Sequence, residues 1–290
     1  MHESVLLNEV IKGLEIKDSD TVLDMTLGAG GHSKAILGLG KKIWLVGIDQ
    51  DDAAISIAKE KLSPWKDKVT IVKGNFRDAE KLLADAGVSK IDKIIFDLGV
   101  SSMQLDDASR GFSFRHDAPL SMKMSEEIKF SARDIVNGWD EKDIANVIFA
   151  YGEERKARTI AKAIVAAREI KPIETTFELA NIVERAIGKK PWEKINPATK
   201  TFQALRIAVN DELGSLKAGL EAAEKILSPQ GRMAVVSFHS LEDRIVKNFM
   251  KEKTEFGDKI ITKKPIVAMD EEISRNPRSR SAKLRIMEKI

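Results

Sequence analysis

The sequence predicts an α/β protein, a Rossmann-like doubly wound parallel sheet into which a helical domain is inserted. In the first hundred residues, short β-branched runs alternate with amphipathic stretches, as in βαβ units. After Gly99 this alternation stops, and residues 101–200 show helix and loop patterns with hardly a strand pattern among them. Strand and helix patterns return together after Phe202.

Each expected element follows from its pattern and its boundaries. Turn residues or amphipathic segments bound the first strands, at 21–25, 43–48, 69–72 and 91–96, and a helix is expected over 53–62. In the insertion, apolar residues recur at spacings of three and four over 144–168, with an interruption near Tyr151. A second helix over 177–187 has Thr175 or Thr176 as its N-cap.

The last part of the chain returns to alternating elements. A helix over 211–227 is expected to end in the turn 228–231, which feeds a strand over 233–238 and a helix from Leu241. Residues 259–267 and 282–288 alternate well enough to form paired edge strands. We therefore expect one discontinuous domain of residues 1–104 and 201–290, and an inserted helical domain of residues 105–200.

Composition narrows the class of protein. A chain of 290 residues can bury roughly 75% of its unfolded surface, which excludes intrinsic disorder. The absence of cysteine excludes disulfides, thiolate metal sites and thiol nucleophiles, and fits a reducing cytoplasm. No run approaches the 18 apolar residues of a membrane helix, and the start MHESVLLNEV has no secretion signal, so we expect a soluble cytoplasmic protein without a membrane partner.

Positive charge is concentrated at the end of the chain. The formal net charge is only +3, yet residues 275–290 contain six basic residues against the single acid Glu288. Such a run is either a solvated charged face or a phosphate-binding patch.

A glycine-rich turn stands where the first strand is expected to end and a helix to begin. The segment Asp24 to Ser33 reads DMTLGAGGHS, and glycines there let a ligand approach the backbone and the free N–H groups of a helix start. Ser33 occupies the place of the third glycine in the dinucleotide pattern, which disfavours a dehydrogenase. Asp49 ends the second strand about 20 residues later, where a carboxylate can accept ribose hydroxyls. These features favour a nucleotide-like cofactor over a plain tight turn.

Two further residues should reach the same edge of the sheet. Phe76 and Asp97 follow the third and fourth strands, and the carboxyl ends of strands are where open α/β sheets bind ligands. Phe76 could stack on an adenine, and Asp97 could accept from an amine. The alternatives are a core position for Phe76 and a helix cap for Asp97. No metal site is predicted, since the four histidines have no paired ligand spacing.

Seven segments in order resemble the ribosomal RNA small subunit methyltransferase H family. They are HESVLLNEV, GAGGHS, FDLGVSSMQLDDASRGFSF, YGEERKARTIAKAI, TKTFQALRIAVNDEL, VVSFHSLEDRIVK and NPRSRSAKLR, and together they run nearly end to end. The resemblance implies an S-adenosylmethionine-dependent enzyme that methylates N4 of a cytidine in the decoding region of bacterial 16S rRNA. It implies a cofactor pocket of Gly30, Gly31, His32, Asp49, Phe76, Asp97 and Gln104. His32 and Gln104 come from the resemblance alone, and either could instead lack a ligand contact.

The chain departs from the family pattern at three places. Residues 121–125 read SMKMS where the family usually has Asp-Met-Arg-Met-Asp, so ion pairing within this loop must differ. If the loop shapes the RNA site, substrate affinity or specificity changes with it. Gln230 replaces a glycine, and Lys156 stands where an aromatic residue is common.

The reaction needs an acceptor for the amine of cytosine, because its lone pair is delocalised into the ring. We expect Asp97 to lie between cofactor and amine, and His239 with Ser240 to help hold the base. A helix-capping role is an equally good interpretation of His239.

The expected partner is 16S rRNA in the small ribosomal subunit, and it requires phosphate contacts. A strand with Arg278, Arg280, Lys283 and Arg285 is the candidate, supported by Lys189, Lys190, Lys194 and Lys200. Two other functions stay open: an amino-methyltransferase acting on another nucleic acid, and a non-catalytic RNA-binding assembly factor.

Overall fold

The chain divides into two compact units. The structure, a computed structural model, describes residues 4–188 and 196–290. One unit is Met1–Gly99 together with Leu213–Ile290, and the other is Val100–Glu212. The sequence placed these boundaries at 104/105 and 200/201 instead. The second boundary differs because α10 (Ala198–Asn210) contributes Phe202 and Leu205 to the core of the second unit, and the first because Val100 packs against the same core.

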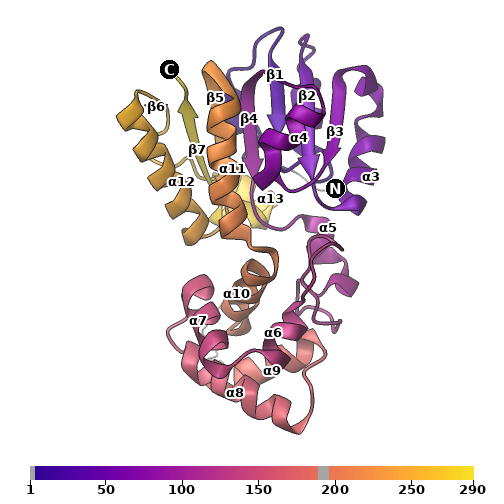
Figure 1. The fold of residues 1–290 in the computed structure, drawn as a ribbon, viewed down its shortest axis with the longest axis vertical. Helices are drawn as coiled ribbons and strands as arrows, with labels where there is room; N and C mark the ends of the chain where they lie inside the picture. The colour runs from indigo at the N-terminus through magenta and orange to yellow at the C-terminus, as the bar shows by residue number, and fades with distance from the viewer. Residues whose placement is uncertain (1–3, 189–195) are drawn as a thin grey trace. The chain divides into compact units, whose positions relative to one another are not determined.

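The first unit is built on one seven-stranded sheet with the order β3-β2-β1-β4-β5-β7-β6 (Figure 1). The first five strands in that order pair in parallel, whereas β7 is antiparallel to both β5 and β6. The order 3-2-1-4-5 is that of doubly wound Rossmann-like sheets, so the predicted fold class is confirmed. The strands are β1 (Thr21–Asp24), β2 (Trp44–Asp49), β3 (Val69–Lys73), β4 (Ile91–Asp97), β5 (Leu227–Ser237), β6 (Lys259–Ile260) and β7 (Lys283–Glu288).

Apolar side chains cover both faces of this sheet. On β4, Ile94 and Phe96 belong to one core cluster and Ile95 to another, as expected for a strand with period two that is buried on both sides. The first cluster packs against α4 (Ala79–Asp85), α11 (Glu212–Ile226) and α12 (Ser240–Lys253), and the second against α1 (Leu7–Leu14), α2 (Gly31–Leu37) and α3 (Asp52–Lys61). The aspartates that belong to β1, β2 and β4 lie at or near the ends of these strands.

Short helical elements complete this unit. They are η1 (Ser63–Lys68), η2 (Phe76–Asp78), η4 (Thr254–Phe256), α13 (Asp270–Arg275) and η5 (Pro277–Ser281). No helix within the described ranges is long and apolar enough to cross a bilayer.

The last strands differ from the sequence prediction. The segment 228–231 is part of β5 rather than a turn before it, because the strand continues through an irregularity where its register against β4 shifts. β7 lies between β5 and β6 rather than at the edge, since it pairs with both. β6 contains only two residues, and the rest of the expected strand 259–267 contributes one isolated bridge, from Ile266 to Leu284.

Apart from one isolated bridge between Pro119 and Thr175, the regular elements that the structure describes in the second unit are helices. Its elements are α5 (Ser102–Asp106), η3 (Ala108–Arg110), α6 (Ala132–Gly138), α7 (Glu141–Gly152), α8 (Ala157–Ile170), α9 (Thr176–Ile187) and α10. The stripe at 144–168 is divided between α7 and α8 by Glu153, whose φ is 47°. Thr175 caps α9 in a capping box, which confirms one of the two expected N-caps.

The loop 121–125, which departs from the family pattern, is held through its backbone. The guanidinium of Arg110 donates to the carbonyl of Met124 at 3.1 Å. The Asn210 amide accepts from the N–H of Met124 and donates to the carbonyl of Met122, both at 2.8 Å. None of these contacts uses a loop side chain, so the substitutions at 121, 123 and 125 leave them intact.

The departure at Gln230 introduces local strain. Its φ is 62°, in the left-handed region that costs a residue with a Cβ roughly 1–2 kcal/mol. Its side chain is exposed and its N–H donates to the carbonyl of Lys289, a bond that glycine would keep. We predict that Gln230→Gly raises the free energy of unfolding by about 0.5–1 kcal/mol in urea titrations. Gln230→Ala, which keeps the Cβ, should change it little; an equal gain from alanine would contradict this explanation.

Candidate active site

The candidate site lies in the first unit, at the carboxyl ends of its parallel strands. Asp24 and Asp49 close β1 and β2, Asp97 closes β4, and His239 follows β5. Because these strands are parallel neighbours, their carboxyl ends meet at one edge. Ligands of doubly wound sheets bind at this edge, next to the point where the strand order reverses.

The glycine-rich turn between β1 and α2 has a backbone that depends on glycine. Gly30 has φ of 72° and α2 begins immediately after it, at Gly31. A Cβ at Gly31 would collide with the hydroxyl of Ser4, so the backbone is closely packed there. The Ser33 hydroxyl donates to the buried Asp24 carboxylate at 2.7 Å, which ties α2 to the end of β1.

Asp49 holds the same turn from the neighbouring strand. One of its oxygens accepts from the N–H of Gly28 at 2.7 Å, and the other from the N–H of Asp51 at 2.9 Å. Burial raises the pKa of Asp49, and these hydrogen bonds act in the opposite direction. The backbone N–H of Gln50 is a third donor to this carboxylate, which has lone pairs for about four donors, so contact with ribose hydroxyls stays a prediction.

Asp97 is the carboxyl group with the most unusual surroundings. Its N–H donates to the Thr26 hydroxyl at 2.6 Å, and its Oδ2 lies 3.5 Å from Nδ1 of His32. Its Oδ1 is buried and has no hydrogen-bond partner among the residues that the structure describes. Burial, and then the negative charge of Glu242, raise the pKa of Asp97 to about 7. About a quarter of the side chain is still exposed, at 26%.

His32 is buried in the first turn of α2 and bridges two segments. Its Nε2 lies 3.1 Å from the carbonyl oxygen of Val5, and its Nδ1 faces Asp97. Burial lowers the pKa of His32, which favours the neutral imidazole. The side chain therefore does more than start a helix, because it connects the N-terminal segment to Asp97.

Phe76 and Gln104 make mainly structural contacts. Phe76 is half-buried, meets the ring of Phe96 edge-on at 5.7 Å between centroids, and packs against Gly219 of α11. Gln104 belongs to the second unit, where its side chain accepts from the N–H of Ser101 in a capping box at the start of α5. Their contacts to a cofactor stay predictions.

His239 caps α12, which confirms the alternative interpretation of this residue. Its Nδ1 accepts from the N–H of Glu242 at 3.4 Å. In return, the Glu242 carboxylate accepts from the N–H groups of Phe238 at 2.8 Å and His239 at 3.3 Å. Glu242 is not among the site residues predicted from the sequence, although a polar residue followed three positions later by Glu is a capping-box signature. Thr26 is not among them either, and the sequence carries no comparable signal for its contact with Asp97.

The four basic residues near the C-terminus do not share one strand. Arg278 and Arg280 lie in η5, and only Lys283 and Arg285 lie in β7, because the proline of NPRSRS starts a helical turn. Both β7 residues pair with Asp243 of α12, at 3.1 Å from Lys283 and 2.7 Å from Arg285.

The other lysines expected to support RNA binding fall into two groups. In the second unit, Lys200 donates to the carbonyl of Glu153 at 3.2 Å. Lys189, Lys190 and Lys194 lie outside the described residues.

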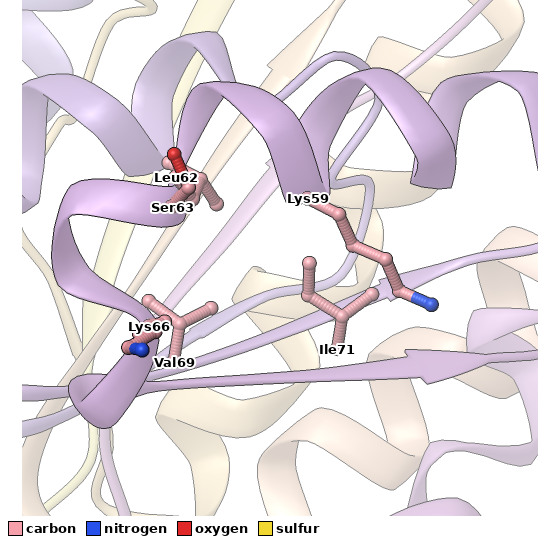
Figure 2. Close-up of a pocket in the computed structure, with 6 residues that line it drawn as sticks. All are labelled: Lys59, Leu62, Ser63, Lys66, Val69 and Ile71. Atoms are coloured by element: carbon pink, nitrogen blue, oxygen red, sulfur yellow. The ribbon is translucent and has the colours of Figure 1, made fainter.

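A pocket of about 180 Å³ lies elsewhere in the first unit (Figure 2). Its lining belongs to the end of α3, to η1 and to β3, the edge strand: Lys59, Leu62, Ser63, Lys66, Val69 and Ile71. None of the expected site residues lines it, so it is separate from the candidate site.

The whole chain matches known methyltransferases in sequence. The profile described as "MraW methylase family" matches residues 1–290. The chain belongs to this family. It is therefore a methyltransferase. Proteins named ribosomal RNA small subunit methyltransferase H from Deinococcus deserti and a Paenibacillus species are 51% and 46% identical, over all of this chain and 94% and 99% of theirs.

The chain is also similar to a solved structure. The putative methyltransferase SMU.1697c from Streptococcus mutans, solved in complex with SAH, is 11% identical with a TM-score of 0.48 over the full length of both chains.

The raised pKa of Asp97 gives a stability prediction. Asp97 binds its proton more tightly in the folded protein than in the unfolded chain. The free energy of unfolding therefore falls as the pH rises from the pKa of the unfolded chain, near 4, to the pKa of the folded protein, about 7. An asparagine side chain imitates the protonated carboxyl, so the free energy of unfolding of Asp97→Asn relative to the parent should rise by about 2–3 kcal/mol between pH 5 and pH 8. Urea unfolding at both pH values measures this. Asp92→Asn, on the same strand at the opposite edge, should show no such growth; a pH-independent effect of Asp97→Asn would contradict the prediction.

Proposed function

We propose that this protein transfers a methyl group from S-adenosylmethionine to N4 of a cytidine in the decoding region of 16S rRNA in the small ribosomal subunit. The family membership and the names of the relatives support a small-subunit rRNA substrate. The proposed transfer to an amine rests on one observation. Asp97 lies at the carboxyl edge of the sheet, and its buried Oδ1 has no hydrogen-bond partner among the described residues. A ribosomal substrate also implies a cytoplasmic location.

The residues of this edge fit a cofactor that combines a nucleoside with a positive charge. The proposed pocket in the first unit consists of Gly30, Gly31, His32, Asp49, Phe76 and Asp97. The N–H groups of the glycine turn suit electron-rich groups, and Asp49 suits ribose hydroxyls. Buried carboxyl groups such as Asp24 and Asp97 gain most from a nearby cation, because burial penalises their negative charge. The cofactor supplies a methyl group that its sulfonium makes electrophilic.

Asp97 is the proposed acceptor for the amine of cytosine. Localising the amine lone pair requires an acceptor within hydrogen-bond distance, and Oδ1 of Asp97, unpartnered within the described ranges, offers one. His239 is proposed to bound the base site from the end of β5. Since its Nδ1 is committed to capping α12, only the rest of the ring is available for this role.

RNA recognition is assigned to the inserted helical unit and to η5. In η5, Arg280 is exposed and Arg278 half-exposed, as phosphate contacts require. Lys283 and Arg285, the other two predicted RNA contacts, share the single carboxylate of Asp243, which offsets one of their two positive charges. The proposed contribution of these two to RNA affinity is therefore the smaller one.

The deciding experiment is methyl transfer to a defined substrate. Small ribosomal subunits prepared without this modification are incubated with the protein and labelled S-adenosylmethionine, digested to nucleosides and analysed by mass. We expect N4-methylcytidine at a single site. Another methylated nucleoside, or transfer only to a different nucleic acid, would overturn the proposed substrate while leaving a methyltransferase. Asp97→Ala should abolish transfer and keep RNA binding.

The two groups of basic residues should behave differently when their charge is reversed. Arg278→Glu and Arg280→Glu, on the more exposed η5, should weaken RNA binding more at low salt than at high salt, because they remove phosphate contacts. Arg285→Glu should instead lower stability by about 2–4 kcal/mol, since it places a carboxylate 8% exposed beside Asp243. Filter binding at two salt concentrations and urea unfolding separate these effects. Equal losses of affinity at both salt concentrations would indicate a structural role for η5.

A further inference from the structure

The contacts of the His32 ring determine which of its two nitrogens carries a hydrogen. The carbonyl of Val5 can only accept a hydrogen bond, so the Nε2 atom 3.1 Å from it carries the hydrogen. In a neutral imidazole, the other nitrogen, Nδ1, then bears a lone pair. That lone pair faces Oδ2 of Asp97 at 3.5 Å.

Two acceptors facing each other in a buried site repel unless one of them holds a proton. His32 is 4% exposed, so water does not relieve this repulsion on its side. Asp24 of β1 and Glu242 of α12 are carboxyl groups whose charges interact with that of Asp97, and both are negative when ionised. Among the described residues, His32 is the basic side chain that pairs with Asp97. The surroundings thus favour one proton on the pair.

We propose that His32 is a positioning residue that keeps one proton on the His32–Asp97 pair until a cationic cofactor binds, and that binding releases this proton. The proposal rests on the proposed methyl donor and deepens the account of its site. A positive charge placed beside Asp97 favours the carboxylate, for the same reason that Asp24 and Glu242 disfavour it. Binding of the donor then completes the ionisation of Asp97.

The released proton makes room for the one that the reaction produces. As N4 forms its bond to the methyl carbon, the carbon–sulfur bond breaks and its electron pair stays on sulfur. The methylated amine carries the positive charge and loses one N–H proton, which the Asp97 carboxylate accepts. An Asp97 that was still protonated could not take it, so the proton release on binding prepares the acceptor.

The affinities of the protein for the donor and for the product should therefore depend differently on pH. S-adenosylmethionine carries one positive charge more than S-adenosylhomocysteine, so only the donor should expel the proton. With a carboxyl that titrates near pH 7, the Kd of the donor should rise about tenfold from pH 8 to pH 6. The Kd of the product should change less than about twofold.

Isothermal titration of the whole protein with each compound tests this without any RNA. In two buffers of different ionisation enthalpy, we expect release of close to one proton with the donor at pH 6 and of about a tenth of a proton at pH 8, where most of the carboxyl is already ionised, and no release with the product. Asp97→Asn should remove both the release and the pH dependence. Asp92→Asn is the matched control and should keep both, because its carboxyl lies at the other end of β4, where it accepts from the N–H of Thr21.

A variant of His32 separates positioning from a purely structural role. In His32→Gln, loss of the Nδ1 acceptor should move the midpoint of the pH dependence to lower pH. A structural role would raise the Kd equally at all pH values.

A measurement on the unaltered protein covers the case in which these variants do not fold. The nitrogen NMR spectrum of its imidazoles should show His32 as the neutral form with hydrogen on Nε2 before the donor is added. Hydrogen on Nδ1, or equal pH dependence of donor and product, would overturn the proposal. Because no RNA is present, failure here is distinguishable from failure of the rRNA assay.

Discussion

The burial of carboxyl groups at the ends of parallel strands is the constraint on which the site depends. Both faces of the sheet are covered mainly by apolar side chains, and Asp24, Asp49 and Asp97 lie at its carboxyl edge. A buried carboxylate must find donors, a proton or a cation. The first two of these groups use donors of the glycine turn and α2, and they thereby fix the shape of that turn.

Asp97 is the exception among these carboxyl groups. Its backbone is fixed by Thr26 and its Oδ2 faces His32, but its Oδ1 has no protein partner within the described ranges. A buried carboxyl oxygen without a partner costs folding stability and is typical of functional sites. The proposed role of Asp97 in methyl transfer rests on this feature.

Capping interactions position the other side of the site. The exchange of hydrogen bonds between His239 and Glu242 starts α12 directly after β5, and it places the Glu242 charge near Asp97. Further along α12, Asp243 pairs with Lys283 and Arg285. One helix start thus tunes the candidate site and also offsets one positive charge on the surface expected to bind RNA.

Sequence patterns alone were sufficient for the fold class, the glycine turn and the positions of Asp49 and Asp97, because period-two burial and strand ends are local properties. They failed where partners are distant in sequence. The place of β7 inside the sheet depends on its pairing with both β5 and β6. The ion pairs of Asp243 join residues about 40 positions apart.

At the candidate site, too, local sequence patterns and contacts between distant segments determine different features. The sequence by itself determined that the glycine turn, Asp49 and Asp97 lie at the carboxyl edge of the sheet. Only the tertiary structure decided which atoms those side chains face, and so which carboxyl group is left to hold a proton. The reason is that a pKa depends on burial and on neighbouring charges, which come from segments as distant as Val5, Asp97 and Glu242.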